Sequence, residues 1–133
     1  MPTYEWAVLR VVPRVDRGEY VNVGVVVYCQ ALDFLRAAVT PDLGRARALD
    51  PALDLDAVRA HLESVAGVCS GDPAAGDNGR RSRGERFRWL VAPRSTVVQP
   101  SPVHTGITDD PAAELEDLMA RMVPPATPRD PPQ

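Results

Sequence analysis

The residues best suited to hold a charged ligand lie close together near the start of the chain: Arg17, Glu19, Asn22 and Gly24. A guanidinium binds phosphate or carboxylate groups through paired N–H donors, and a glycine lets a ligand approach the backbone. These four residues are therefore candidates for ligand or partner binding. A structural interpretation stands beside this one, and it describes the commoner situation at strand ends. Arg17 and Glu19 would then complete a hairpin, and Asn22 would bond a neighbouring loop.

A second polar group lies between residues 94 and 104 and includes Arg94, Ser101 and His104. Such side chains bind phosphate or carboxylate, and a serine with a histidine suggests a nucleophile and its base. The sequence specifies no third, orienting residue and contains no Gly-x-Ser-x-Gly elbow, so we predict no catalytic residue. We add Trp89 to these three residues as candidates for ligand or partner contact, because tryptophan and arginine are enriched at interface hot spots. An ordinary polar loop is the alternative.

The histidines and cysteines do not have the spacing of a metal site. His61 and His104 are the only histidines, and Cys29 and Cys69 are the only cysteines. No Cys-x-x-Cys or His-x-x-x-His pattern occurs, and neither a P-loop nor a dinucleotide-binding fingerprint is present. We therefore predict no metal and no cofactor.

A basic run from Arg80 to Arg88 places five arginines beside Phe87 and Trp89. Basic and aromatic side chains together are typical of single-stranded nucleic-acid binding. The chain as a whole is acidic, with a net charge of −3, which argues against a general affinity for nucleic acids. Nucleic-acid binding is therefore the weaker alternative.

The length of 133 residues suits one domain with its own core. No apolar run approaches the ~20 residues of a membrane span, and Met1–Glu5 lacks the features of a signal peptide. Cys29 and Cys69 fall at expected core positions, which favours reduced, buried thiols. We expect a cytoplasmic protein without membrane contact.

The element that must position the first group is the apolar run Gly18–Cys29, which fits a strand buried on both faces. Asn22 would need hydrogen-bond partners inside it. Gly24, expected on the same face as Asn22, indicates a bulge or the close approach of another backbone. Tyr4–Val12 alternates as a preceding strand, so the two should form an antiparallel hairpin, with Phe34–Val39 as a third strand.

Two main helices are predicted after these strands. The first spans Asp54–Cys69, with Asp54 as its N-cap. Its apolar face repeats at three- and four-residue spacing and consists of Leu55, Val58, Leu62, Val65, Ala66 and Cys69. The second spans Pro111–Met122, with Asp110 as its N-cap and Pro111 at its first position.

The remaining segments carry weaker signals. A short helix is expected near 42–48, and 85–91 fits either a short helix or a strand. Residues 95–98 are strand-like. Residues 70–84 are rich in Gly, Asp and Arg and are expected to form a mobile loop, and 124–133 are expected to form a disordered, proline-rich tail.

These elements predict an α+β fold, with an antiparallel sheet of about four to five strands and two main helices packed on it. Residues 1–123 should form a single domain. The oligomeric state does not follow from the sequence.

The chain resembles a bacterial family, the domain-of-unknown-function 3037 family (DUF3037), over residues 3 to 123. The resemblance rests on polar as well as apolar positions: Tyr4 through Arg10, Gly18-Glu19, Val21-Asn22, Gly24-Val25, Phe87, Trp89-Leu90, Pro93-Arg94-Ser95, Pro100-Ser101-Pro102 and Asp110-Pro111. Members are short cytoplasmic proteins, often encoded beside a HipA-like serine/threonine kinase. The resemblance thus implies a partner or regulator of such a kinase, as in toxin–antitoxin pairs, and it supplies no catalytic residues.

We therefore expect a non-enzymatic protein-binding or regulatory module. The alternative is a small enzyme or a protein that binds a nucleotide or phosphate ligand through the two polar groups. One geometric observation separates these hypotheses. Convergence of the two groups on one pocket favours the small-molecule hypothesis, and their separation favours protein binding.

Overall fold

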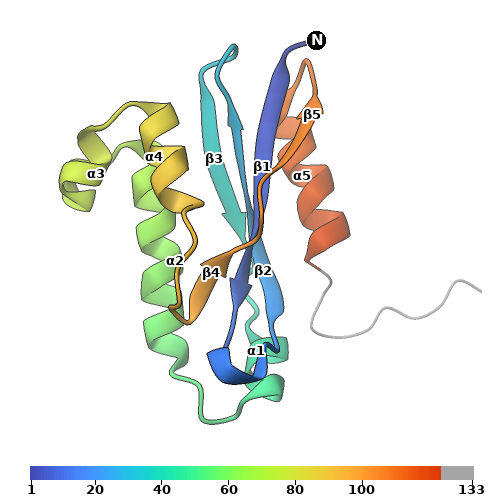
Figure 1. The fold of residues 1–133 in the computed structure, drawn as a ribbon, viewed down its shortest axis with the longest axis vertical. Coiled ribbons are helices and arrows are strands. Elements are labelled where there is room, and N and C mark those ends of the chain that lie inside the picture. The colour runs from blue at the N-terminus through green and yellow to red at the C-terminus, as the bar shows by residue number, and fades with distance from the viewer. Residues whose placement is uncertain (124–133) are drawn as a thin grey trace, which may run out of the picture.

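The computed structural model describes residues 1–123, apart from the side chains of 78 and 79, and contains a five-stranded antiparallel sheet (Figure 1). The strand order is β3-β2-β1-β4, and β5 also pairs with β1. The strands are β1 (Thr3–Val11), β2 (Val21–Cys29), β3 (Phe34–Val39), β4 (Val98–Pro100) and β5 (His104–Ile107). The predicted α+β fold is confirmed, and the tail 124–133 lies outside the described residues.

Strand β2 is one of the two inner strands of the sheet, since it pairs with β1 on one side and β3 on the other. Val23 and Val25–Val27 are buried, as the apolar run predicts. The strand begins at Val21, three residues later than expected. Gly18 instead closes a 3₁₀ turn, Val15–Arg17, with a φ of 69° that glycine adopts readily.

Helices cover the two faces of the sheet unequally (Figure 1). Helices α2 and α4 pack on one face, over a core that includes Leu9, Val26 and Phe87, while α5 packs on the other, over Val25 and Val27. The helices are α1 (Gly44–Leu49), α2 (Leu55–Ser70), α3 (Asp77–Arg80), α4 (Arg83–Leu90) and α5 (Pro111–Met122). Within residues 1–123, no helix combines the length and apolar character needed to cross a membrane.

The longer helices begin where capping side chains predict. Asp54 accepts a hydrogen bond from the Ala57 N–H, and Asp110 accepts one from Ala113. Ser82 caps α4 in the same way, through the N–H of Glu85. Each cap satisfies one of the N–H groups that a helix start leaves without a partner inside the helix.

Two local predictions need correction, and a third is decided between its two stated alternatives. The strand expected at residues 95–98 instead begins at Val98, as β4. Strand β5 was not predicted. Neither strand has the alternating buried pattern by which a strand is recognised in a sequence. The segment 85–91 is helical, as one of its two alternatives stated. The predicted loop 70–84 contains a 3₁₀ turn at Pro73–Ala75 and the short helix α3.

Candidate functional site

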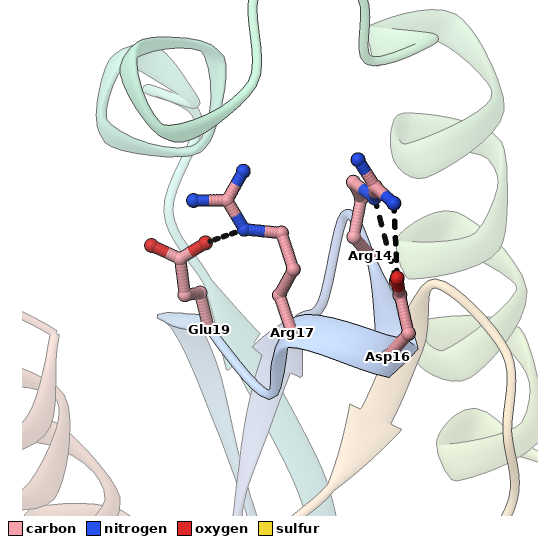
Figure 2. Close-up of polar contacts among 4 residues, drawn as sticks. All are labelled: Arg14, Asp16, Arg17 and Glu19. Atoms are coloured by element: carbon pink, nitrogen blue, oxygen red, sulfur yellow. Dashed lines mark hydrogen bonds and ion pairs between the residues drawn. The ribbon is translucent and has the colours of Figure 1, made fainter.

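The charged residues of the first polar group, Arg17 and Glu19, lie in the connection between β1 and β2, and their charges are paired locally (Figure 2). Arg17 Nε lies 2.5 Å from a Glu19 carboxylate oxygen, and Arg14 pairs with Asp16 at 2.9 Å. Figure 2 shows the two guanidinium groups pointing the same way, each beside its own carboxylate. They border a small hollow of about 240 Å³ that also includes Asp50. These arginines are therefore largely neutralised, and the hollow has no excess of positive charge.

Asn22 and Gly24 lie on opposite faces of the sheet, which corrects the prediction that they share one. The register of β1 against β2 shifts between Leu9 and Arg10, so Leu9 pairs with Gly24 while Arg10 pairs with Asn22. The extra residue is Val23, and a bulge of this kind changes the face that each neighbour occupies. Asn22 and Gly24 therefore cannot form one binding edge.

Both residues have structural contacts instead. The Asn22 side-chain amide donates to the Met122 carbonyl at 2.9 Å, which ties β2 to the end of α5. A Cβ added to Gly24 would lie 2.7 Å from the Ala38 carbonyl oxygen, so the close approach of β3 requires a glycine. Arg10, beside Asn22, stacks its guanidinium 4.2 Å from the centroid of the Tyr20 ring.

The second polar group separates in the same manner. Ser101 is 2 % exposed; its hydroxyl accepts from the Val8 N–H at 2.8 Å and donates to the Pro102 carbonyl. His104 is exposed and packs its ring 4.5 Å from the Trp6 ring, on the α5 side of the sheet. Because the serine is used inside the fold, these two residues do not form a nucleophile and base.

Arg94 and Trp89 do lie together. The Arg94 guanidinium lies 4.8 Å from the centre of the Trp89 ring and also donates to the Trp89 carbonyl. Both side chains are half-buried. Arg94 therefore holds Trp89 in place at the end of α4.

Trp89 is the one predicted site residue that lines a groove of about 760 Å³ on the described surface. The groove runs between α4 and the ends of β1, β2 and β5. Its lining residues are Thr3, Glu5, Tyr28, Gln30, Arg81, Gly84, Glu85, Arg88, Trp89 and Thr105. We call this surface the α4 groove.

Helix α4 and Arg81, which precedes it, form one wall of the groove. Residues 77–90 carry a net charge of +3, but the charged residues that line the groove are two arginines, Arg81 and Arg88, and two glutamates, Glu5 and Glu85. Arg88 pairs with Glu5 across the groove at 2.7 Å. Arg81 is exposed and forms no ion pair with any residue of the described chain.

One arginine of this run has a different role. Arg86 is 7 % exposed and donates to the Val68 and Cys69 carbonyls at the end of α2, at 3.0 and 3.3 Å. The nucleic-acid hypothesis requires one continuous basic surface. The run from Arg80 to Arg88 does not form one, because Arg86 is buried. The arginines that face solvent are Arg80, Arg81, Arg83 and Arg88.

Most of the groove was missed because it depends on long-range pairing. Thr3, Glu5 and Thr105 line it because β5 pairs with β1 with Glu5 opposite Thr105. Besides Trp89, only Arg81 and Arg88 carried a sequence signal, as members of the basic run. The rest required a strand that the sequence pattern does not reveal.

The titratable groups with shifted pKa values lie outside the groove. Burial raises the pKa of the Cys69 thiol to about 12, which keeps it protonated and unreactive. Burial and the nearby Arg94 lower the pKa of His61 on α2. Among the described residues, no group of three His, Cys, Asp or Glu side chains is placed to hold a metal ion. The lining of the groove offers charged, polar and apolar side chains for contact.

Comparisons with known proteins give one match. The family model described as a protein of unknown function, DUF3037, matches residues 6–123. No curated protein and no solved structure matches the chain.

Proposed function

We propose that this chain, which belongs to the DUF3037 family, is a non-enzymatic protein-binding or regulatory module whose contact surface is the α4 groove. The observation that carries this proposal is the separation of the predicted polar groups. Arg17 and Glu19 lie on the turn at one end of the sheet, Ser101 is buried, and Trp89 lies in the groove. A small-molecule enzyme would need its polar groups to converge on one pocket.

The groove has features that protein interfaces favour. A tryptophan and two arginines lie on one concave surface, and these residue types dominate interface hot spots. Arg94 already holds Trp89 through stacking and a hydrogen bond, so less side-chain freedom is lost on binding.

The partner that we propose is a HipA-like serine/threonine kinase encoded nearby, in the cytoplasm. The family resemblance supports this partner, and the exposed Arg81 of the groove suits an acidic side chain on it. Kinase assays with and without this chain would show whether binding activates or inhibits the kinase.

Co-expression with the neighbouring kinase tests the proposal. The two proteins should co-purify, and Trp89→Ala or Arg94→Ala should weaken the complex by about 1–3 kcal/mol. Arg17→Ala, on the distant turn, is the matched control and should bind as the wild type does. Thermal melts of each variant establish that it is folded.

Thermal-shift measurements distinguish the proposal from the small-molecule alternative. With ATP, inorganic phosphate and MgCl₂, the melting temperature should show no saturable increase if the module binds protein. A saturable shift that Arg81→Ala abolishes, with no kinase recovered, would overturn the proposal in favour of ligand binding.

A further inference from the structure

Strand β5 forms an edge of the sheet, and part of its backbone hydrogen-bonding capacity points away from the sheet. In antiparallel pairs, residues that exchange both hydrogen bonds alternate with residues that exchange none. The Thr108 N–H donates to the Pro2 carbonyl at 3.0 Å, and the register with β1 is regular through β5. Thr105 and Ile107 therefore direct their N–H and C=O groups outward. Within the described chain, β5 pairs with β1 alone.

The opposite edge of the sheet is covered. Strand β3 packs against α2, and Leu35 on it is buried. The N–H of Ala37 forms a hydrogen bond to the Cys69 thiol of α2. The β3 edge of the sheet is thus covered by a helix, whereas the β5 edge is open to another chain.

The open edge has little protection against pairing beyond its short length. Natural sheets protect exposed edges with short strands, charged residues, prolines, bulges or a covering element. The four residues of β5 are His104, Thr105, Gly106 and Ile107, and none of them is a proline, lysine or acidic residue. Ile107 is 62 % exposed, although it is a large apolar side chain. An edge of this kind leaves the outward backbone groups of Thr105 and Ile107 accessible to an added strand.

The open edge and the α4 groove adjoin each other, since Thr105 of β5 lines the groove opposite α4. Ile107 has its side chain on the same face of the sheet as Thr105, because side chains alternate along a strand. A chain added to this edge would send every second side chain toward the groove. Those side chains would meet Arg81, which lines the groove, is exposed and has no ion pair within the described chain.

We propose that the partner contributes an extended, acidic segment that pairs with β5 as an additional strand. This inference rests on the proposed protein-binding function and specifies its mode. Backbone hydrogen bonds from Thr105 and Ile107 supply affinity, and acidic side chains of the added strand pair with Arg81 and supply specificity. A helical or globular surface would leave these outward N–H and C=O groups without partners, and nucleic acid would not match their spacing.

A selection with random displayed peptides on the full chain tests this mode without knowledge of the natural partner. The enriched peptides should be acidic, with β-branched residues at alternate positions. Thr105→Pro removes one outward N–H while it leaves the bonds to β1 intact, so the variant should fold but bind these peptides at least about tenfold more weakly. Thr105→Val retains the N–H and should bind as the wild type does.

Arg81→Glu should weaken the same peptides by about tenfold, whereas Arg45→Glu on α1 should leave their affinity unchanged. Amide hydrogen exchange gives an independent readout. In the free protein, the amides of Thr105 and Ile107 should exchange faster than that of Gly106, and a selected peptide should protect both.

The outcomes separate this inference from the proposed function. Selected peptides that bind Thr105→Pro and Arg81→Glu as tightly as the wild type would overturn strand addition, while protein binding elsewhere would stand. Selection of basic or helical peptides would also overturn it. Failure of the kinase to co-purify, with acidic peptides still bound at β5, would instead overturn the proposed partner.

Discussion

A single arginine shows how burial changes the meaning of a sequence motif. Arg86 belongs to a run that suggests a binding surface, but its guanidinium lies under α4 and reaches the last carbonyls of α2. The end of a helix leaves such carbonyls without partners inside the helix, and a cation there is favoured by the helix dipole. Arg86 therefore joins two helices on one face of the sheet.

Arg86→Ala should lower the free energy of unfolding by about 2–3 kcal/mol, because it removes charge-assisted hydrogen bonds to the Val68 and Cys69 carbonyls, and Val68 retains only its bond from the Gly71 N–H. Urea denaturation measures the loss. Arg88→Ala on the same helix is the matched control; its exposed ion pair with Glu5 should contribute less than about 1 kcal/mol. Equal losses in the two variants would contradict the structural role of Arg86.

The Cys69 thiol predicts an alkaline limit to stability. Burial raises its pKa from 9.0 to about 12, and Arg86 and the Ala37 N–H oppose this shift only in part. Above pH 9.0 the unfolded chain therefore loses a proton that the folded chain keeps, so the free energy of unfolding falls as pH rises toward about 12.

Urea denaturation between about pH 8 and pH 10 should show this decline, and Cys69→Ala should make it shallower at a lower overall stability. The raised pKa of Tyr4, which burial and Glu114 cause, adds to the decline at higher pH in both proteins. An identical pH slope in the variant and the wild type would exclude Cys69 as the source.

At the scale of elements, the bulge in β2 decides which side chains share a face. Its extra residue, Val23, is buried with Leu9, so the apolar pattern continues through the shift without a visible break. Gly24 then faces α2 and Asn22 faces α5. A single-residue insertion of this kind inverts the faces of all residues beyond it.

Gly24→Ala tests the close approach of β3 at this point. The added Cβ would lie 2.7 Å from the Ala38 carbonyl oxygen and 2.9 Å from a methyl of Val39, so the two strands must separate. Such overpacking costs about 1–3 kcal/mol, which chemical denaturation would measure. Gly67→Ala in α2 is the control, because its Cβ would meet nothing closer than 4.0 Å and helix propensity favours alanine.

The elements with strong local patterns were predictable, and those defined by distant partners were not. Strands β1 to β3 and helices α2 and α5 carry regular apolar periods and recognisable caps, so their type and approximate bounds follow from the sequence. Strand β5 has four residues that are mostly exposed, and its existence depends on β1. The α4 groove depends on β5, so Trp89 was predicted while Thr105 and Tyr28 were missed.

The whole molecule is held together by contacts between the two ends of its sequence. Strand β1 pairs with β4 and β5 from the last third of the chain, and Asn22 bonds the end of α5. Residues 71–81 lie in the middle of the sequence. Among the side chains described, this segment contributes none that is buried, and it packs mainly against α2. The chain therefore has a continuous core with a peripheral connection in its middle.

This arrangement predicts where trypsin first cuts residues 1–123. The chain has no lysine, so cleavage follows arginine, and Arg80 and Arg81 are exposed in the peripheral connection. Early cleavage there should occur before cleavage at Arg10 or Arg36, which lie in paired strands. Mass spectrometry of the earliest fragments identifies the site.

The two fragments should remain associated after this cut. The C-terminal fragment retains β4, β5 and α5, which are bound to β1 and β2 by strand pairing and by the core that contains Leu115 and Leu118. The nicked protein should therefore elute from gel filtration with the intact protein and separate only in denaturant. A first cut within β1 or β3, or fragments that separate without denaturant, would show that the two ends of the chain do not form one core.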